Sequence, residues 1–228
     1  KRRIAVTKVD YTAKQMARTP VFWMIYVSFV AVAAGGLMAT AQIGPIAKDL
    51  GLARIPMSFF GMTLPLLTMT LSIDNLCNGF TRPLCGFLSD RIGRENTMFI
   101  VFIGEGLALL GLMQYGSNPY AFMVIAALIF LCWGEIFSIF PAICADTFCS
   151  KFAAGNAGLL YTAKGSASLL VPLASVLAST GGWNAVFLVS AGITIAAGIG
   201  SKFVLAPIRS RWVQAQGAGE SFVGAGRS

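Results

Sequence analysis

Six long apolar runs, separated by short polar breaks, occupy most of this 228-residue chain. A helix needs about 20 mainly apolar residues to cross the hydrocarbon core of a bilayer, and each run meets that length. The hydrophobic fraction of 56% and the charged fraction of 11% indicate a polytopic membrane protein rather than a soluble domain. We therefore predict an all-α bundle over residues 20–206, with six transmembrane helices at 21–42, 57–88, 97–115, 120–144, 153–179 and 183–205.

Basic residues are distributed unevenly over the predicted loops. Segment 1–19, a cytoplasmic leader or a connector between domains, is rich in them, and more follow the second, fourth and sixth spans. The opposite side has only Lys48 and Arg54. Because cytoplasmic loops are enriched in Lys and Arg, we expect both ends of the chain in the cytoplasm and the bundle in the inner or plasma membrane. Segment 207–228 is predicted to be a disordered cytoplasmic tail.

Several kinds of site are disfavoured by the residues present. The chain has no His, and its five Cys residues lack the paired spacing of metal ligands, so we predict no metal site. No phosphate-binding glycine loop and no nucleophile elbow occur, so we predict neither a cofactor nor a catalytic residue. The net charge of +8 follows from the loop asymmetry and requires no nucleic-acid partner. A membrane protein that is not an enzyme is the resulting expectation.

Two cations, Arg82 and Lys164, lie deep inside predicted spans. A charge at the centre of a membrane helix costs about 2.5–3.5 kcal/mol, so each marks a functional site by default. Arg82 precedes Asp90 by eight residues and Lys164 follows Ala153 by eleven, which places them about 12 and 16 Å from the cytoplasmic ends of their helices. Both heads can therefore reach one anion site near the midplane. Each cation lies on the middle helix of a triplet, which predicts two inverted three-helix repeats.

Polar side chains surround each cation on its own helix face. They recur at intervals of three or four residues, so they cannot all face lipid. The predicted binding face consists of Asn78 and Arg82 on the second span, with Tyr161, Lys164 and Ser168 on the fifth.

Two acids leave a second interpretation of Arg82 open. Asp74 lies on the same face of the second span, and Glu105 lies in the third span. Either acid could pair with Arg82 and merely hold the bundle together. Either could instead neutralise a cation in an empty site and permit proton-coupled movement. Asp74 and Glu105 are therefore candidate proton or charge partners.

The fourth span supplies aromatic rings. Trp133 and Phe137 share one face, and a large ring beside buried cations can restrict a cavity and hold the cations by cation–π contact. Phe130 and Phe140 lie on that face too and are interpreted as packing residues. Glu135 is rotated about 200° from Trp133, so we expect it on the other side of the helix.

The loop after the second span has the pattern G-x-x-x-D-R-x-G-R, made by Gly86, Asp90, Arg91, Gly93 and Arg94. This pattern resembles the signature loop of the major facilitator superfamily. We expect the Asp90 carboxylate to meet the positive N-terminal end of the fifth span and to latch the two cation-bearing helices together. Glu95 stands where that signature usually has a further basic residue.

Longer stretches resemble a narrower family. Residues 77–86, 133–141 and 155–168 look like the C-terminal half of an oxalate:formate antiporter. The resemblance implies a major facilitator fold in which an Arg and a Lys bind substrate carboxylates inside an aromatic cage, roles that carry over to Arg82, Lys164 and Trp133. Geometry adds Phe137 and Tyr161 as cage candidates. Family members have twelve spans, so an N-terminal six-helix half is the expected partner.

The resulting functional prediction is one half of a secondary transporter for small carboxylates. Oxalate and formate are the expected substrates, exchanged by alternating access, and membrane lipid is the other expected partner. Two alternatives stay open: a proton-coupled monocarboxylate symporter, and a truncated membrane protein that does not transport.

Overall fold

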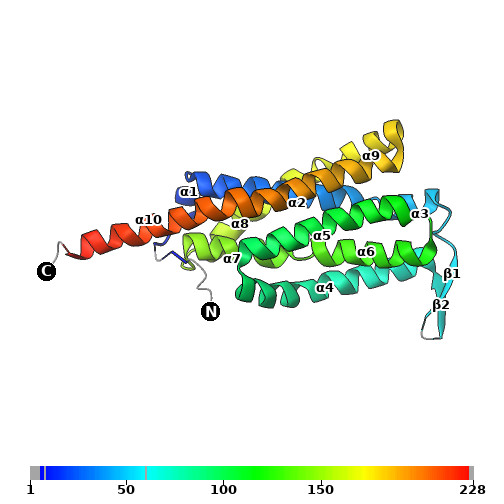
Figure 1. The fold of residues 1–228 in the computed structure, drawn as a ribbon, viewed down its shortest axis with the longest axis horizontal. Coiled ribbons are helices and arrows are strands. Elements are labelled where there is room, and N and C mark those ends of the chain that lie inside the picture. The colour runs from blue at the N-terminus through cyan, green and yellow to red at the C-terminus, as the bar shows by residue number, and fades with distance from the viewer. Residues whose placement is uncertain (1–5, 8, 60, 226–228) are drawn as a thin grey trace.

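The computed structural model describes residues 6–7, 9–59 and 61–225, which form an elongated bundle of long helices (Figure 1). A short helix, α1 (Ala13–Met16), precedes the first long one, α2 (Pro20–Thr40), and α3 (Ile43–Asp49) follows. The start of α2 is specified locally. Thr19 accepts a hydrogen bond from the Phe22 backbone N–H, and Pro20 occupies the first helical position, where its missing N–H costs nothing.

The second predicted span begins nine residues later than expected. Strands β1 (Pro56–Phe59) and β2 (Met62–Pro65) form an antiparallel hairpin, and α4 (Leu66–Ile92) starts directly after it. Gly61 has a φ of +78°, which suits the turn between the strands. Pro65 disfavours a helical conformation in the residue before it, so the helix cannot extend further back. The predicted start at residue 57 was therefore wrong.

The third and fourth passes contain three helices. They are α5 (Arg94–Tyr115), α6 (Pro119–Trp133) and α7 (Ile136–Phe148). The Asn118 side chain caps α6 by accepting hydrogen bonds from the Tyr120 and Ala121 backbone N–H groups. Two residues separate α6 from α7, so the predicted single span at 120–144 is an interrupted helix. The interruption comes immediately after Trp133.

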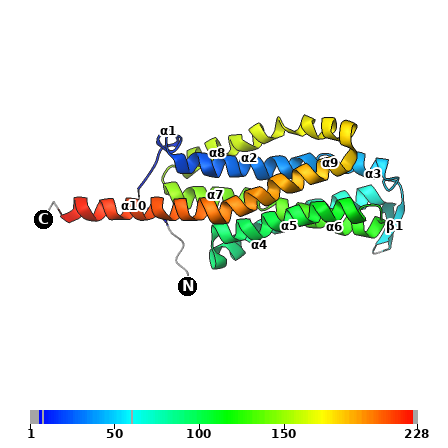
Figure 2. The ribbon, with the colours of Figure 1, turned by 45° about the horizontal axis from the view of Figure 1, so that its top comes forward.

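The last two passes include α8 (Ala153–Ser168), α9 (Val171–Gly200) and a five-residue π-helix, η1 (Ser201–Leu205). Helix α9 contains a reversal at Gly182, whose φ of +69° is not helical. Figure 2 shows the chain turning back there, in the yellow part of the ribbon. The fifth pass is therefore α8 with the first part of α9, and the sixth is the remainder of α9, as the predicted break at residues 180–182 requires.

Four helical stretches in the described part of the chain are long and apolar enough to cross a membrane. They are Pro20–Asp49, Arg94–Tyr115, Pro119–Phe148 and Ala153–Gln216. The last contains two passes because of the reversal at Gly182. Helix α4, with 27 residues, is long enough but carries polar and charged side chains along its length. These elements together are the six passes of an all-α polytopic membrane fold.

The segment after the sixth pass is helical as far as residue 225, so the prediction of a disordered tail was wrong over that range; residues 226–228 lie outside the described part of the chain. Helix α10 (Ala206–Ala225) continues from η1 and projects from the bundle (Figure 1). Its first turn is anchored, because Arg209 is buried and its Nε donates to Glu95 Oε1 at 2.6 Å. Glu95, the departure from the signature loop, thus binds α10. Ala and Gln are favourable helix residues and allow the helix to continue.

The chain connections gather at the two ends of the bundle. In Figure 1, α1, α10 and the α4–α5 and α7–α8 connections lie at one end, and α3 and the hairpin lie at the other. The basic loops therefore share one end, as the sequence predicted. Which end faces the cytoplasm, and the inverted-repeat relationship, stay predictions. Between the ends, buried rings fill the core: Phe29 stacks on Phe140 with centroids 4.3 Å apart, which confirms Phe140 as a packing residue.

Candidate functional site

The two cations in the spans lie against one aromatic ring. The guanidinium carbon of Arg82 is 4.9 Å from the centroid of Phe137, and Lys164 Nζ is 4.6 Å from the same centroid. Arg82 comes from α4, Lys164 from α8 and the ring from α7, so three helices meet here. The structure thus brings together residues that are 82 positions apart in the sequence.

Two further predicted cage residues surround this ring. Trp133, at the end of α6, packs edge-on against Phe137 with centroids 5.8 Å apart, and Lys164 Nζ lies 5.9 Å from its ring. The Tyr161 hydroxyl donates to the Phe137 carbonyl oxygen at 3.2 Å and is close enough to Arg82 to interact electrostatically. The three residues implied by the family resemblance, Arg82, Lys164 and Trp133, therefore lie together with the two cage candidates Phe137 and Tyr161.

Asn78 and Ser168, the two other predicted site residues, lie at the margins. Asn78, one turn before Arg82, packs against Gly134 at the α6–α7 interruption. The Ser168 hydroxyl donates to the Gly165 carbonyl oxygen at 2.7 Å, at the end of α8. Neither forms a described hydrogen bond with the shared Phe137 residue, although both lie on the helices that carry the cations. Their role in binding stays a prediction.

Asn78 packs closely against Gly134, which leaves no room for a side chain at that position. A Cβ atom there would lie 2.9 Å from the Asn78 carbonyl oxygen and 3.1 Å from its Cα. Backbone atoms must then move, so we expect Gly134→Ala to destabilise the full-length protein by about 1–3 kcal/mol. Gly192→Ala is the matched control, because a methyl group meets nothing within 4 Å there. Equal thermal unfolding midpoints for the two variants would contradict the packing described here.

The acids do not neutralise Arg82. Both carboxyl oxygens of Asp74, and both of Glu105, are buried without a hydrogen-bond partner among the described residues. The interpretation in which Arg82 pairs with one of them to hold the bundle together is therefore wrong for this conformation. Arg82 is exposed on the surface of the chain. Its charge is available to a ligand.

Helix α2 contributes to the site in a way that the sequence did not reveal. The Tyr26 hydroxyl lies 3.1 Å from the Thr162 hydroxyl and 3.0 Å from that of Ser166, which flank Lys164 on α8. Phe29 packs edge-on against Tyr161 at 6.0 Å. The sequence feature that could have predicted this contact is Tyr26, a polar residue in a mainly apolar span.

Glu135 lies at the interruption between α6 and α7, fully buried, and both its carboxyl oxygens lack a described partner. No described contact joins it to the cations. It is close enough to Glu105 to interact electrostatically. The sequence placed Glu135 away from the Trp133 site but gave no sign of this second acid beside it.

The signature loop makes ion pairs different from the predicted latch. Asp90 pairs with Arg94 at 2.6 Å, and Arg94 Nε also donates to Asp146 Oδ2 at 2.9 Å. Asp146 belongs to α7, so Arg94 at the start of α5 bridges Asp90 of α4 and the cage-bearing helix α7, in place of the predicted pairing of Asp90 with the start of α8. Arg91 lies over the Phe87 ring at 4.0 Å. Gly93 has a φ of +96°, the conformation that its position between α4 and α5 requires.

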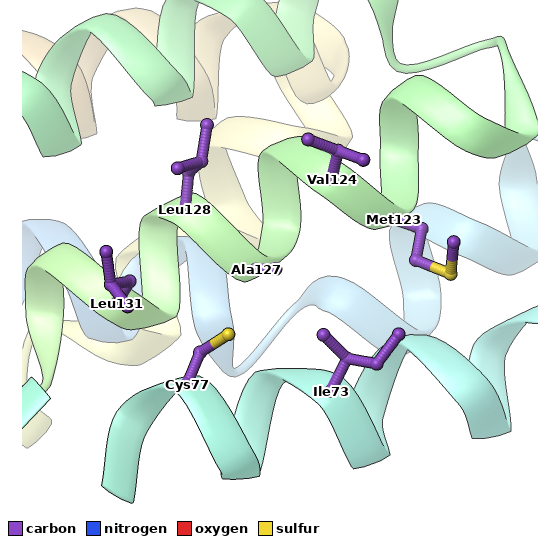
Figure 3. A pocket seen from close by; sticks show the side chains of 7 residues that line it. All are labelled: Ile73, Cys77, Met123, Val124, Ala127, Leu128 and Leu131. Atoms are coloured by element: carbon purple, nitrogen blue, oxygen red, sulfur yellow. The ribbon is translucent and has the colours of Figure 1, made fainter. Parts of the chain in front are cut away.

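A separate hollow lies between α4 and α6 (Figure 3). Its volume is about 210 Å³, and its lining is Ile73, Cys77, Met123, Val124, Ala127, Leu128 and Leu131. No charged residue lines it. A small anion has nothing to bind there, so the cations around Phe137 are the better candidate site.

Comparison with known proteins identifies the family of the chain. The Major Facilitator Superfamily sequence model matches residues 23–224. The chain belongs to the Major Facilitator Superfamily. Members of this superfamily are polytopic membrane proteins with all-α folds, as the bundle here is. The matched range begins within α2 and extends through the five later passes.

Two relatives cover most of the chain. An oxalate:formate antiporter of Oxalobacter formigenes is 37% identical over 194 residues, 84% of this chain and 44% of that protein. The uncharacterized MFS-type transporter YhjX of Escherichia coli (strain K12) is 27% identical over 167 residues, 72% of this chain and 39% of that protein. The chain spans less than half the length of these relatives. Their names describe transporters rather than enzymes.

Proposed function

We propose that Arg82 and Lys164 form one binding site for a small carboxylate anion, in a carrier that works by exchange. The observation that supports this most strongly is the shared Phe137 ring, with each cation within 5 Å of its centroid. A planar guanidinium can hold one carboxylate by two hydrogen bonds, and an ammonium can hold a second carboxylate as a point charge. A dicarboxylate dianion would neutralise both.

The two charges also favour exchange over one-way transport. On insertion scales two cations in a membrane cost about 5–7 kcal/mol, and their mutual repulsion adds to that. The empty site therefore opposes a change of orientation. A bound anion removes this obstacle, so the loaded carrier reorients faster than the empty one. Alternating access would come from rocking of this bundle against a second six-helix bundle.

Oxalate and formate are the proposed substrates. The support is the 37% identity to a relative named as an oxalate:formate antiporter, together with the two-cation site that suits a dicarboxylate. The aromatic groups Trp133, Phe137 and Tyr161 would close the cage around the anion. Rings exclude water and strengthen the attraction between the cations and a carboxylate.

Exchange by the full-length protein in lipid vesicles tests the proposal. We expect rapid uptake of labelled oxalate into vesicles loaded with oxalate or formate, and uptake at least about tenfold slower into empty vesicles, because the unloaded site reorients slowly. Equal uptake in both would contradict exchange. Uptake into empty vesicles driven by a pH gradient alone would instead support the proton-coupled symporter, for which the unpaired buried acids are the favouring observation.

A further inference from the structure

A buried carboxyl group meets the Trp133 indole behind the proposed anion site. A Cβ atom on Gly36 of α2 would collide with Cδ1 and Nε1 of Trp133 and would lie 2.8 Å from Oε1 of Glu105. The indole N–H and the carboxyl group therefore approach the same glycine. Both are buried, and neither has a hydrogen-bond partner among the described residues. An unpaired donor thus lies beside an unpaired acceptor.

The surroundings of Glu105 offer no compensating cation. Within the described part of the chain, no Lys or Arg forms an ion pair with it. The titratable groups that interact with it are on the α6–α7 pass: Cys132 and Glu135. Helix α4 adds the Cys85 thiol beside Cys132. Helix α9 contributes the Thr194 hydroxyl and the Ser190 backbone carbonyl oxygen near Gly35, neither of which carries a charge.

Such a carboxyl group is sensitive to the charge on the neighbouring site. A buried carboxylate without a cation is strongly disfavoured, so its proton occupancy depends on any positive charge nearby. Trp133 links Glu105 to a positive charge, because its ring lies 5.9 Å from Lys164 Nζ. Glu105 and Lys164 therefore both lie close to Trp133: Glu105 at the glycine against which the indole packs, and Lys164 over the ring.

We propose that Glu105 is a proton-binding site coupled to the anion site through Trp133. In the empty state the uncompensated cations favour the Glu105 carboxylate, which lies beside the indole N–H. When an anion neutralises the cations, the carboxylate loses that support and takes up one proton from solvent. No other bond forms or breaks. The inference rests on the proposed anion site, and it adds a second ligand, the proton, to the binding step.

Linkage fixes the direction of the pH effect. If anion binding promotes proton uptake at Glu105, protonation of Glu105 must strengthen anion binding by the same factor. A unit charge on the order of 10 Å away, at an effective dielectric constant of about 20, changes an affinity on the order of tenfold. Oxalate affinity should therefore fall by about that factor as pH rises through the titration of Glu105.

The test measures oxalate affinity of the full-length protein between pH values of about 5 and 9, where oxalate stays a dianion. We expect the wild-type affinity to fall on the order of tenfold and the Glu105→Gln affinity to stay constant near the wild-type value at low pH. Asp74→Asn is the matched control, because it removes another buried, unpaired carboxyl group and should retain the pH dependence. Parallel pH profiles for wild type and Glu105→Gln would overturn the proposal.

Two further measurements test the coupling without relying on the oxalate affinity of a variant, and the first of them needs only wild type. Adding oxalate to protein in weak buffer with a pH dye should cause proton uptake, and its absence would overturn the proposal. Without any anion, Trp133 fluorescence, taken as the difference from Trp133→Phe, should titrate with pH in wild type and not in Glu105→Gln. If wild-type Trp133 fluorescence titrates with pH but the protein binds no anion at any pH, the proposed anion site is wrong and the proton site at Glu105 stands.

Discussion

Replacing Arg82 or Lys164 with Gln should each abolish most anion exchange. Removing one partner of a desolvated, hydrogen-bonded charge pair costs about 2–5 kcal/mol, so we expect initial rates of oxalate exchange to fall at least about 30-fold. Gln removes the charge and keeps a polar, hydrogen-bonding group at the end of a shorter side chain. The measurement is the exchange of labelled oxalate by full-length protein in loaded vesicles, normalised to the amount of inserted protein.

Lys202→Gln provides the control for charge removal. Lys202 Nζ lies over the Phe99 ring at 4.5 Å, nearly the distance between Lys164 and Phe137, but it belongs to η1 and is remote in sequence from the site. We expect this variant to exchange oxalate at close to the wild-type rate. If Lys164→Gln behaves like Lys202→Gln, the role given to Lys164 is wrong.

The second large effect is expected at Phe137, the ring that both cations share. Cation–π contacts contribute about 0.5–2 kcal/mol each, and Phe137→Leu removes two of them together with an edge of the cage. We expect oxalate affinity to fall roughly 10- to 100-fold. Phe137→Tyr keeps the ring and should stay within a few-fold of wild type. Binding by calorimetry separates this effect from any change in the rate of reorientation.

A ring outside the site controls for general packing effects. Phe203 of η1 packs edge-on against Phe99 with centroids 6.3 Å apart and is exposed. Phe203→Leu should leave oxalate affinity unchanged. An affinity for Phe137→Leu that equals the Phe203→Leu value would show that the shared ring is not part of the binding site.

The cations and their ring could be predicted from the sequence because membrane solubility and helix periodicity constrain them strongly. Arg82 and Lys164 are conspicuous as charges inside apolar runs, and their distances from the helix ends place both heads at a similar depth. Trp133 and Phe137 are four residues apart and so share a helix face. The structure places both cations against the Phe137 ring. The similar depth of the two cations in the membrane did not by itself predict that they contact the same ring.

Other features depend on tertiary contacts that no local pattern specifies. Glu105 and Trp133 lie together because α2 approaches closely at Gly36. A glycine in a membrane helix permits such an approach, but the sequence does not show which residues will pack against it. Likewise, Arg94 pairs with Asp146 on α7, and the sequence does not indicate which of the acids near that end of the bundle it contacts. The helix face of Glu135 was predictable, whereas its neighbour across the bundle was not.

The helix boundaries likewise depend partly on contacts that the local sequence does not show. The start of α4 was misplaced because residues 57–65 are apolar enough to join a span, yet two prolines and a glycine turn make them a hairpin. Helix α10 was misjudged because composition alone resembles a flexible tail. The Arg209–Glu95 contact that anchors its first turn joins residues 114 positions apart.

Coupling between Arg82 and Lys164 tests the central claim most directly. The experiment measures oxalate affinity, at one pH and one salt concentration, for full-length wild type, Arg82→Gln, Lys164→Gln and the double variant. Two cations that grip one dianion should be strongly coupled, so the double variant should lose little beyond the worse single variant, with an interaction energy on the order of 1–3 kcal/mol. Losses in free energy that simply add would show that the two cations serve separate sites and would contradict the account.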